Sequence, residues 1–193
     1  MSKSCHANFR LFSFERISVR ELSLTGSLSL AKGSVRIVYE LKQADTVNSS
    51  RVLWPRAKRS GERRDELWTT TCMEFFVTTA ADQFYWEYNF SPCGDWNIYH
   101  LDDYRHGLKP EPCNRTPVIR GRSTPGYYQL EVTAELPSSL IQSPALKAGI
   151  TAVVESHDRH ISHWALYHGG STADFHRRDG FTLHLENHSA SQA

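Results

Sequence analysis

Hydrophobic and polar residues alternate along most of this 193-residue chain. A period of two predicts β-strands that bury one face, and no long stretch shows the 3.6-residue period of an amphipathic helix. Turn-forming residues separate about ten such segments, which is typical of a sandwich or barrel. We therefore predict an all-β fold, a two-sheet antiparallel β-sandwich with less than about 15% helix. The expected strands cover residues 9–14, 22–30, 34–41, 72–79, 84–90, 96–101, 127–136, 149–155, 163–167 and 181–185.

Length and charge narrow the class of protein. We expect residues 1–186 to form a single domain and residues 187–193 a flexible tail. The 22 Lys and Arg residues nearly balance the 21 Asp and Glu residues, which argues against a nucleic-acid partner or an anionic membrane surface. Residues 1–20 lack the apolar core of a secretory signal, and no apolar run approaches the ~20 residues of a membrane span. We therefore expect a cytoplasmic protein whose four cysteines stay reduced.

One predicted hairpin, residues 72–90, carries most of the functional information. A turn at residues 80–83 places Glu74 opposite Asn89. The same register places Glu87 opposite Phe76. A slip of one residue would mix the two faces, so the register is strongly specified. One face is wholly apolar and should be core: Met73, Phe75, Val77, Phe84, Trp86, Tyr88 and Phe90. The other face carries Cys72, Glu74, Phe76, Thr78, Tyr85, Glu87 and Asn89.

Two carboxylates and an amide on that second face allow two interpretations. Like charges this close repel unless one is protonated or a ligand donates hydrogen bonds to them. A carboxylate accepts such bonds from sugar hydroxyls, and an aromatic ring packs on the C–H face of a sugar. The alternative is an ordinary sheet face whose polar side chains are solvated.

Several segments resemble the DOMON-like group related to family 9 carbohydrate-binding modules. The resemblance covers about residues 67–185, and the segments that carry it are Leu67–Val77, Tyr85–Pro92, Gly94–Trp96, Tyr104–Arg105, His163–Trp164, Asp174–His176 and Asp179–Leu183. It implies a sandwich with jelly-roll-like connections. It also implies that Trp68 and Glu74 hold a terminal sugar, and that Trp164 closes an aromatic clamp.

The resemblance further implies that the polar pair Glu87 and Asn89 contributes to the sugar site. The relatives carry a basic residue at the position of Glu87 and are usually secreted, so the chain departs from the pattern on both points. The identity of the sugar therefore stays open. We expect four further side chains to support the site: Tyr85, Trp96, Arg105 and His176.

We therefore predict a non-catalytic domain that binds a small carbohydrate-like ligand, without a metal or other cofactor. Three alternatives stay open. Glu74 and Glu87 have the residue types of a glycosidase pair. Haem would need an axial Met or His, but Met73 falls on the predicted core face, and the ten histidines match no metal-binding motif. The third alternative is a structural or protein-interaction sandwich, whose protein partner the sequence does not name.

Overall fold

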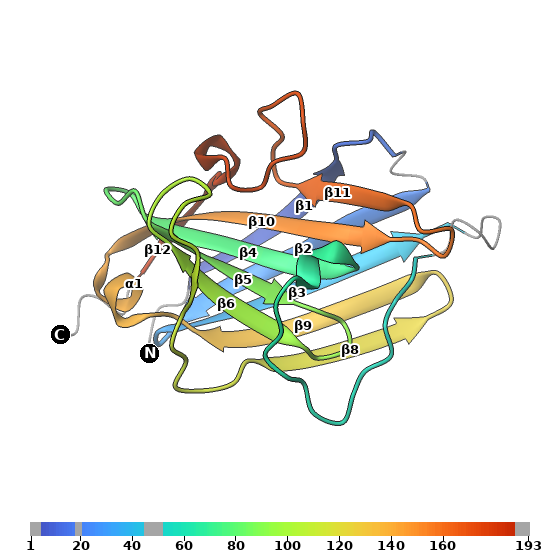
Figure 1. The fold of residues 1–193 in the computed structure, drawn as a ribbon, viewed down its shortest axis with the longest axis horizontal. Coiled ribbons are helices and arrows are strands. Elements are labelled where there is room, and N and C mark those ends of the chain that lie inside the picture. Colours follow the sequence, from blue (N-terminus) through green and yellow to red (C-terminus); the bar gives the residue numbers. More distant parts are fainter. Residues whose placement is uncertain (1–4, 18–20, 45–51, 188–193) are drawn as a thin grey trace.

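The computed structural model describes residues 5–17, 21–44 and 52–187, and its strands form one antiparallel sheet (Figure 1). The strand order is β7-β6-β5-β4-β10-β11-β1-β2-β3-β9-β8, and β12 pairs with part of β10. The strands are β1 (Cys5–Ser13), β2 (Leu22–Ala31), β3 (Ser34–Gln43), β4 (Cys72–Thr79), β5 (Tyr85–Phe90), β6 (Trp96–Leu101), β7 (Lys109–Pro110), β8 (Val118–Thr124), β9 (Tyr127–Glu135), β10 (Ala145–Glu155), β11 (Ile161–Ala165) and β12 (Leu183–Glu186).

The sheet curls so that its two arms share one core. Strands β4, β5, β6, β10 and β11 belong to one arm, and β1, β2, β3, β8 and β9 to the other. Buried side chains of both arms, such as Ile37 on β3 and Phe75 on β4, belong to one hydrophobic cluster. We predicted two sheets, whereas the arms are continuous because the end of β1 pairs with β11 through Phe12–Ala165 and Ser13–Trp164. The backbone N–H and C=O groups of these residues therefore pair with each other. Without this pairing, β1 and β11 would each be the open edge of a separate sheet.

Helical segments are few and short, as predicted. The described residues contain one α-helix, α1 (Ser138–Gln142), and the 3-10 turns η2 (Leu67–Thr69) and η3 (Arg178–Gly180). No helix among them is both long and apolar enough to cross a membrane. Asn187, which we assigned to a tail, is buried, and its amide donates hydrogen bonds to three carbonyls near α1. The rest of the predicted tail, residues 188–193, lies outside the described residues.

The hairpin of β4 and β5 has the predicted register. Glu74 pairs with Asn89, and Phe76 pairs with Glu87. The apolar face packs into the core, where Trp86 is only 4% exposed. The alternation of residue types along both strands is therefore enough to place these side chains on the correct faces.

The opposite face of this hairpin is also buried, so the solvated interpretation is wrong. A second, smaller apolar cluster of Phe76, Tyr85, Tyr99, Leu101 and Phe181 lies on it. Phe181 stacks on Phe76 with ring centroids 5.7 Å apart. The Phe181 ring also lies close to the backbone of β10, and this requires glycine at position 149. A Cβ there would lie 2.9 Å from the ring. The segment between β11 and β12 thus packs against the polar face of the hairpin and is called the covering segment below. Figure 1 shows most of it above β10.

Candidate functional site

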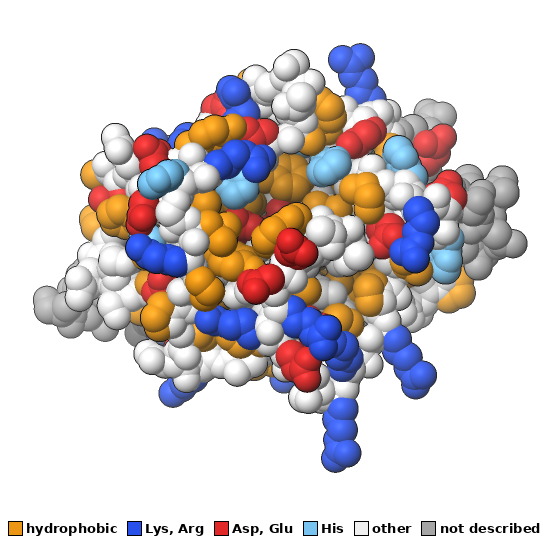
Figure 2. Space-filling model, in the orientation of Figure 1, with side chains coloured by type: hydrophobic (Ala, Val, Ile, Leu, Met, Phe, Trp, Pro, Cys, Tyr) orange, Lys and Arg blue, Asp and Glu red, His pale blue; other side chains and the backbone are white. Residues whose placement is uncertain are grey.

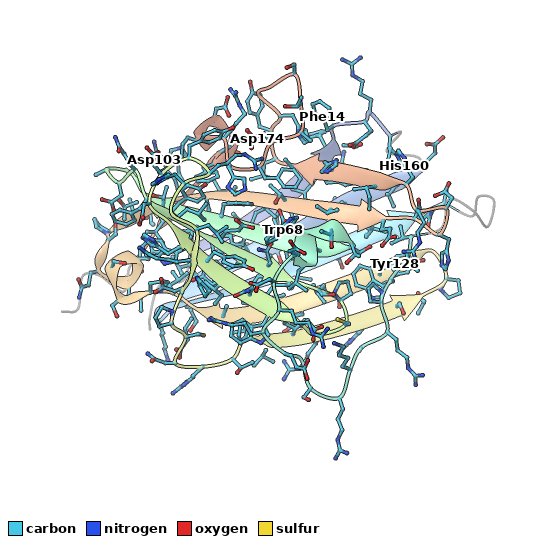
Figure 3. The ribbon with its side chains drawn as sticks, in the orientation of Figure 1. Phe14, Trp68, Asp103, Tyr128, His160 and Asp174 are labelled. Carbon is cyan, nitrogen blue, oxygen red and sulfur yellow. The ribbon has the colours of Figure 1, made fainter. Side chains whose placement is uncertain are left out.

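A cavity of about 310 Å³ lies over the polar face of β4 and β5. Figure 2 shows this side of the molecule hollowed near its centre, with acidic, basic and histidine side chains around the hollow. Figure 3 shows Trp68 of η2 near the middle of the same view, with Asp174 above it on the covering segment. The lining residues are Trp68, Glu74, Phe76, Glu87, Leu101, Arg105, Leu108, Val153, His163, Ala173, Phe175 and His176.

Two buried glutamates contribute carboxyl groups to the cavity wall. Glu74 on β4 is 2% exposed and Glu87 on β5 is 4% exposed. Glu74 Oε2 accepts a hydrogen bond of 2.8 Å from Thr151 Oγ1, and Glu87 Oε1 accepts one of 2.8 Å from Asn89 Nδ2. The second oxygen of Glu87, Oε2, is buried and accepts no hydrogen bond from any residue that the structure describes.

Burial disfavours the charged form of both carboxyl groups. It raises the pKa of Glu74 above its ordinary value, and repulsion from Glu87 raises that pKa further. Burial likewise raises the pKa of Glu87, although Asn89 and Arg105 oppose the shift. The pair therefore retains a proton to higher pH than exposed glutamates do.

A chain of hydrogen bonds orients His176 beside Glu87. The backbone N–H of Arg105 donates to Tyr85 Oη over 3.3 Å, and Tyr85 Oη lies 2.7 Å from His176 Nδ1. Burial and the nearby Arg105 lower the pKa of His176 to about 4, so its ring is neutral near pH 7. Burial raises the pKa of Tyr85 to about 12, so the phenol keeps its proton. We assign its O–H as the donor to Nδ1, because Oη already accepts from the N–H of Arg105.

With this assignment the N–H of His176 is on Nε2, and the ring is part of the cavity wall. His176 Nε2 lies 3.9 Å from Glu87 Oε2, which is too far for a direct hydrogen bond. A donor N–H and a free acceptor oxygen therefore stand close together without satisfying each other.

The cationic groups on the wall have their own acidic partners. Arg105 lies in the left-handed backbone region with φ 50, and its guanidinium donates to Asp174 Oδ1 over 2.8 Å. Asp174 also accepts a hydrogen bond from Tyr104. His163 Nδ1 lies 2.7 Å from Glu15 Oε1. These pairs fix the rim of the cavity. Arg105 also acts on Glu87, because its positive charge lowers the pKa of that carboxyl group.

Aromatic rings form another part of the cavity wall. Trp68 is 36% exposed, and its ring contacts Tyr99 edge-on at 5.9 Å between centroids. Tyr99 is held in turn by a hydrogen bond of 2.6 Å to Asp65 Oδ1. Phe175 packs 5.9 Å from His163 on the covering segment. Such faces suit the C–H surface of a ring-shaped ligand.

The structure brings together five of the predicted site residues in the cavity wall: Trp68, Glu74, Glu87, Arg105 and His176. Two more stand directly behind them. Asn89 is fully buried and holds Glu87, and Tyr85 holds His176. These two residues therefore orient the wall without lining it.

Two predicted site residues lie elsewhere, because they belong to the opposite face of the sheet. Trp164 pairs with Ala152, which pairs with Met73, and this row points into the main core. Trp164 is fully buried there, with its indole N–H donating to Ser162 Oγ. Trp96 pairs with core-facing Phe90, and the Arg63 guanidinium lies 4.7 Å above its ring. The prediction that Trp164 closes an aromatic clamp is therefore wrong. Its neighbour in sequence, His163, lines the cavity instead.

Sequence reasoning missed the covering segment and the residue that holds Glu74. Phe175 and Ala173 lie in a stretch without periodicity, so nothing in the pattern predicted that it folds over the hairpin. Thr151 could have been found, because it is a polar residue within the apolar run of residues 149–154. Among the described residues no group of three or more His, Cys, Asp or Glu side chains could hold a metal ion. Met73 is buried in the core rather than in the cavity wall.

Comparisons with known proteins bear on the fold. No protein-family model matches the chain, and no curated protein matches it. A solved structure of a candidate carbohydrate-binding protein from Bacteroides uniformis matches with a TM-score of 0.61 at 12% identity, over 90% of this chain and 83% of that chain. The two share a fold. A family 9 carbohydrate-binding module from Caldicellulosiruptor kristjanssonii, solved with glucose, matches with a TM-score of 0.49 at 10% identity, over 86% of this chain and 76% of that chain.

Proposed function

We propose that the chain is a non-catalytic protein that binds a small carbohydrate or similar polyhydroxylated ligand in this cavity. The observation that carries the proposal is Glu87, a buried residue of the cavity wall whose Oε2 has no hydrogen-bond donor among the described residues. Leaving such an atom unpaired costs roughly 1–3 kcal/mol. A ligand hydroxyl would donate to it and recover that cost.

The composition of the wall fits a sugar better than a purely apolar ligand. Glu74 and Glu87 supply acceptors, whereas Arg105 and His176 supply donors for ring and hydroxyl oxygens. Trp68 and Phe175 supply faces for the C–H groups of the ring. The volume of about 310 Å³ suits one or two small rings, since ligand pockets begin near 300 Å³.

Further parts of the proposal rest on the sequence and on the shared fold. The protein from Bacteroides uniformis is described as a candidate carbohydrate-binding protein, which supports the same role here. We also propose a relation to the DOMON-like group and its family 9 modules, on the segments given above. From the sequence we also propose that the protein is cytoplasmic and that it needs no cofactor.

A thermal-shift screen against a panel of mono- and disaccharides tests the proposal. A sugar held at 100 times its dissociation constant should stabilise the protein by about 2.7 kcal/mol. Trp68→Ala should remove most of that shift, because it deletes an aromatic part of the wall. Trp54→Ala is the matched control, since Trp54 packs on Tyr128 and does not line the cavity. A panel in which no sugar shifts the melting temperature of the wild-type protein would overturn the proposal.

A glycosidase is the alternative that one observation favours. A buried carboxyl that keeps its proton near neutral pH could protonate a leaving group, and a second carboxylate lies on the neighbouring strand. Aryl glycosides that release a chromophore separate the two functions. Release that disappears in both Glu74→Gln and Glu87→Gln would favour the enzyme, and binding without release favours the non-catalytic role.

A further inference from the structure

The charges around the cavity do not balance, and the excess is acidic. Glu74 and Glu87 are both buried in the wall. The basic groups in the same wall are Arg105 from the loop after β6, His163 from β11 and His176 from the covering segment. The other titratable groups near the glutamates have pKa values raised by burial and carry no positive charge: Tyr39, Cys72, Tyr85 and Tyr99. Whether any of these three neutralises the glutamates decides which ligand the cavity prefers.

None of the three neutralises the pair completely. Arg105 is held by Asp174 at 2.8 Å, so it offsets the charge of Glu87 only in part. Any charge on His163 is matched by Glu15, 2.7 Å away. His176 is neutral, its Nδ1 lies 2.7 Å from Tyr85 Oη, and its Nε2 lies 3.9 Å from Glu87 Oε2. Even with one proton shared between Glu74 and Glu87, the pair carries a net charge of about −1.

A buried negative charge with an unpaired acceptor favours a cation. An ammonium group donates up to three hydrogen bonds and brings the missing positive charge, whereas a hydroxyl donates one and brings none. The aromatic faces of Trp68, Phe76 and Phe175 add to the attraction, because a cation is stabilised over a ring from which water is excluded.

We propose that the ligand of this cavity is an amino sugar whose protonated amine contacts the Glu74–Glu87 pair, in preference to a neutral sugar of the same shape. This inference rests on the proposed function and narrows its ligand class. Binding displaces the proton that the pair holds in the empty cavity, so uptake of the ammonium form is accompanied by proton release to solvent.

Titration calorimetry on the full chain tests this with three matched sets of sugars: glucosamine, galactosamine and mannosamine, their N-acetyl forms, and glucose, galactose and mannose. At least one amino sugar should bind about tenfold or more tightly than both of its neutral counterparts, as expected for hydrogen bonds to a charged group. Repeating the titration in two buffers of different ionisation enthalpy should reveal net proton release.

Two variants make the result specific. Glu87→Gln keeps the shape but removes the charge and should abolish most of the preference for the amino form. Glu155→Gln should leave the preference unchanged, because Glu155 is equally buried on β10 but is paired with Arg159 outside the cavity. Neutral sugars that bind as tightly as amino sugars would overturn this inference and leave the proposed function standing. A lack of binding by every sugar would overturn the proposed function itself.

Discussion

Trp68 and Trp164 differ in what their rings contact, and their substitution should therefore have opposite effects. Trp164 is fully buried in the main core, so Trp164→Ala should destabilise the fold by about 3–5 kcal/mol. Trp68 is 36% exposed at the cavity, so Trp68→Ala should cost only about 1 kcal/mol but abolish sugar binding. Urea unfolding and sugar titration of both variants separate the two roles. A stable Trp164→Ala protein that has lost its ligand would restore the clamp that the structure contradicts.

Glu74 illustrates how a residue can serve binding at the expense of stability. Glu74→Gln removes repulsion with Glu87, so the free energy of unfolding of the unliganded protein should stay equal or rise by on the order of 1 kcal/mol. Its melting temperature should therefore be equal or higher. The same change should weaken sugar binding by about 1.5–3 kcal/mol, because the amide replaces a charged acceptor. Melting curves with and without the sugar measure both effects. A lower melting temperature together with an unchanged ligand shift would assign Glu74 to the scaffold.

At the scale of elements, the β4–β5 hairpin depends on its core-facing aromatic residues. Trp86 is 4% exposed and lies against Phe84 and His100 with ring centroids 5.4 and 5.0 Å away. Trp86→Ala should cost about 3–5 kcal/mol through the cavity that it leaves. Phe84→Ala, at the edge of the same cluster, is the comparison and should cost less. Unfolding of Trp86→Ala at the wild-type urea midpoint would show that the hairpin faces are misassigned.

The hairpin could be predicted because its pattern is strict and its turn is short. Seven alternating apolar residues admit one register, and that register places Glu74 opposite Asn89 and Glu87 opposite Phe76, as in the structure. The same argument located the carboxyl pair of the candidate site. A local pattern therefore fixes geometry wherever neighbouring strands are also neighbours in sequence.

The remaining parts of the site depend on contacts that no local pattern reveals. Trp164 was misplaced because its face is set by β10, through the pairing of Ala152 with Trp164, rather than by its own short strand. The covering residues Phe175 and His176 have no alternation that could predict their contact with β4. Strand β8 was missed for a related reason, since it is an edge strand with mostly exposed side chains.

At the scale of the whole molecule, stability should fall as the pH rises above about 4.5. Glu74 and Glu87 have raised pKa values in the fold, so between pH 4.5 and those values the folded state binds more protons than the unfolded state. Stability then decreases with pH by linkage. His176 opposes part of this decline up to about pH 6.5, because its pKa is lowered from 6.5 to about 4, but two carboxyl groups outweigh one imidazole. Asp95 acts in the opposite direction, because hydrogen bonds from Lys58 and from the N–H of Glu62 outweigh its burial and lower its pKa. Its contribution is lost below about pH 4.

These two trends predict a stability maximum near pH 5 in the absence of ligand, on the acidic side of neutrality. Chemical denaturation at pH 3, 5, 7 and 8 measures the profile. Glu74→Gln should flatten the decline between pH 5 and 8, whereas Glu155→Gln should leave its slope unchanged. A wild-type profile that rises from pH 5 to pH 8 would contradict the burial of an uncompensated carboxyl pair.

The pairing of β1 with β11 has a consequence for synthesis. A chain leaves the ribosome from its N-terminus, so Phe12 emerges long before its partner Ala165. Contacts so distant in sequence form late and slowly. The cavity follows the same order, because the hairpin with its two glutamates is made well before Phe175 and His176 can cover it. The proposed ligand would thus find an assembled site only in the finished fold, and not while the nascent chain is still growing.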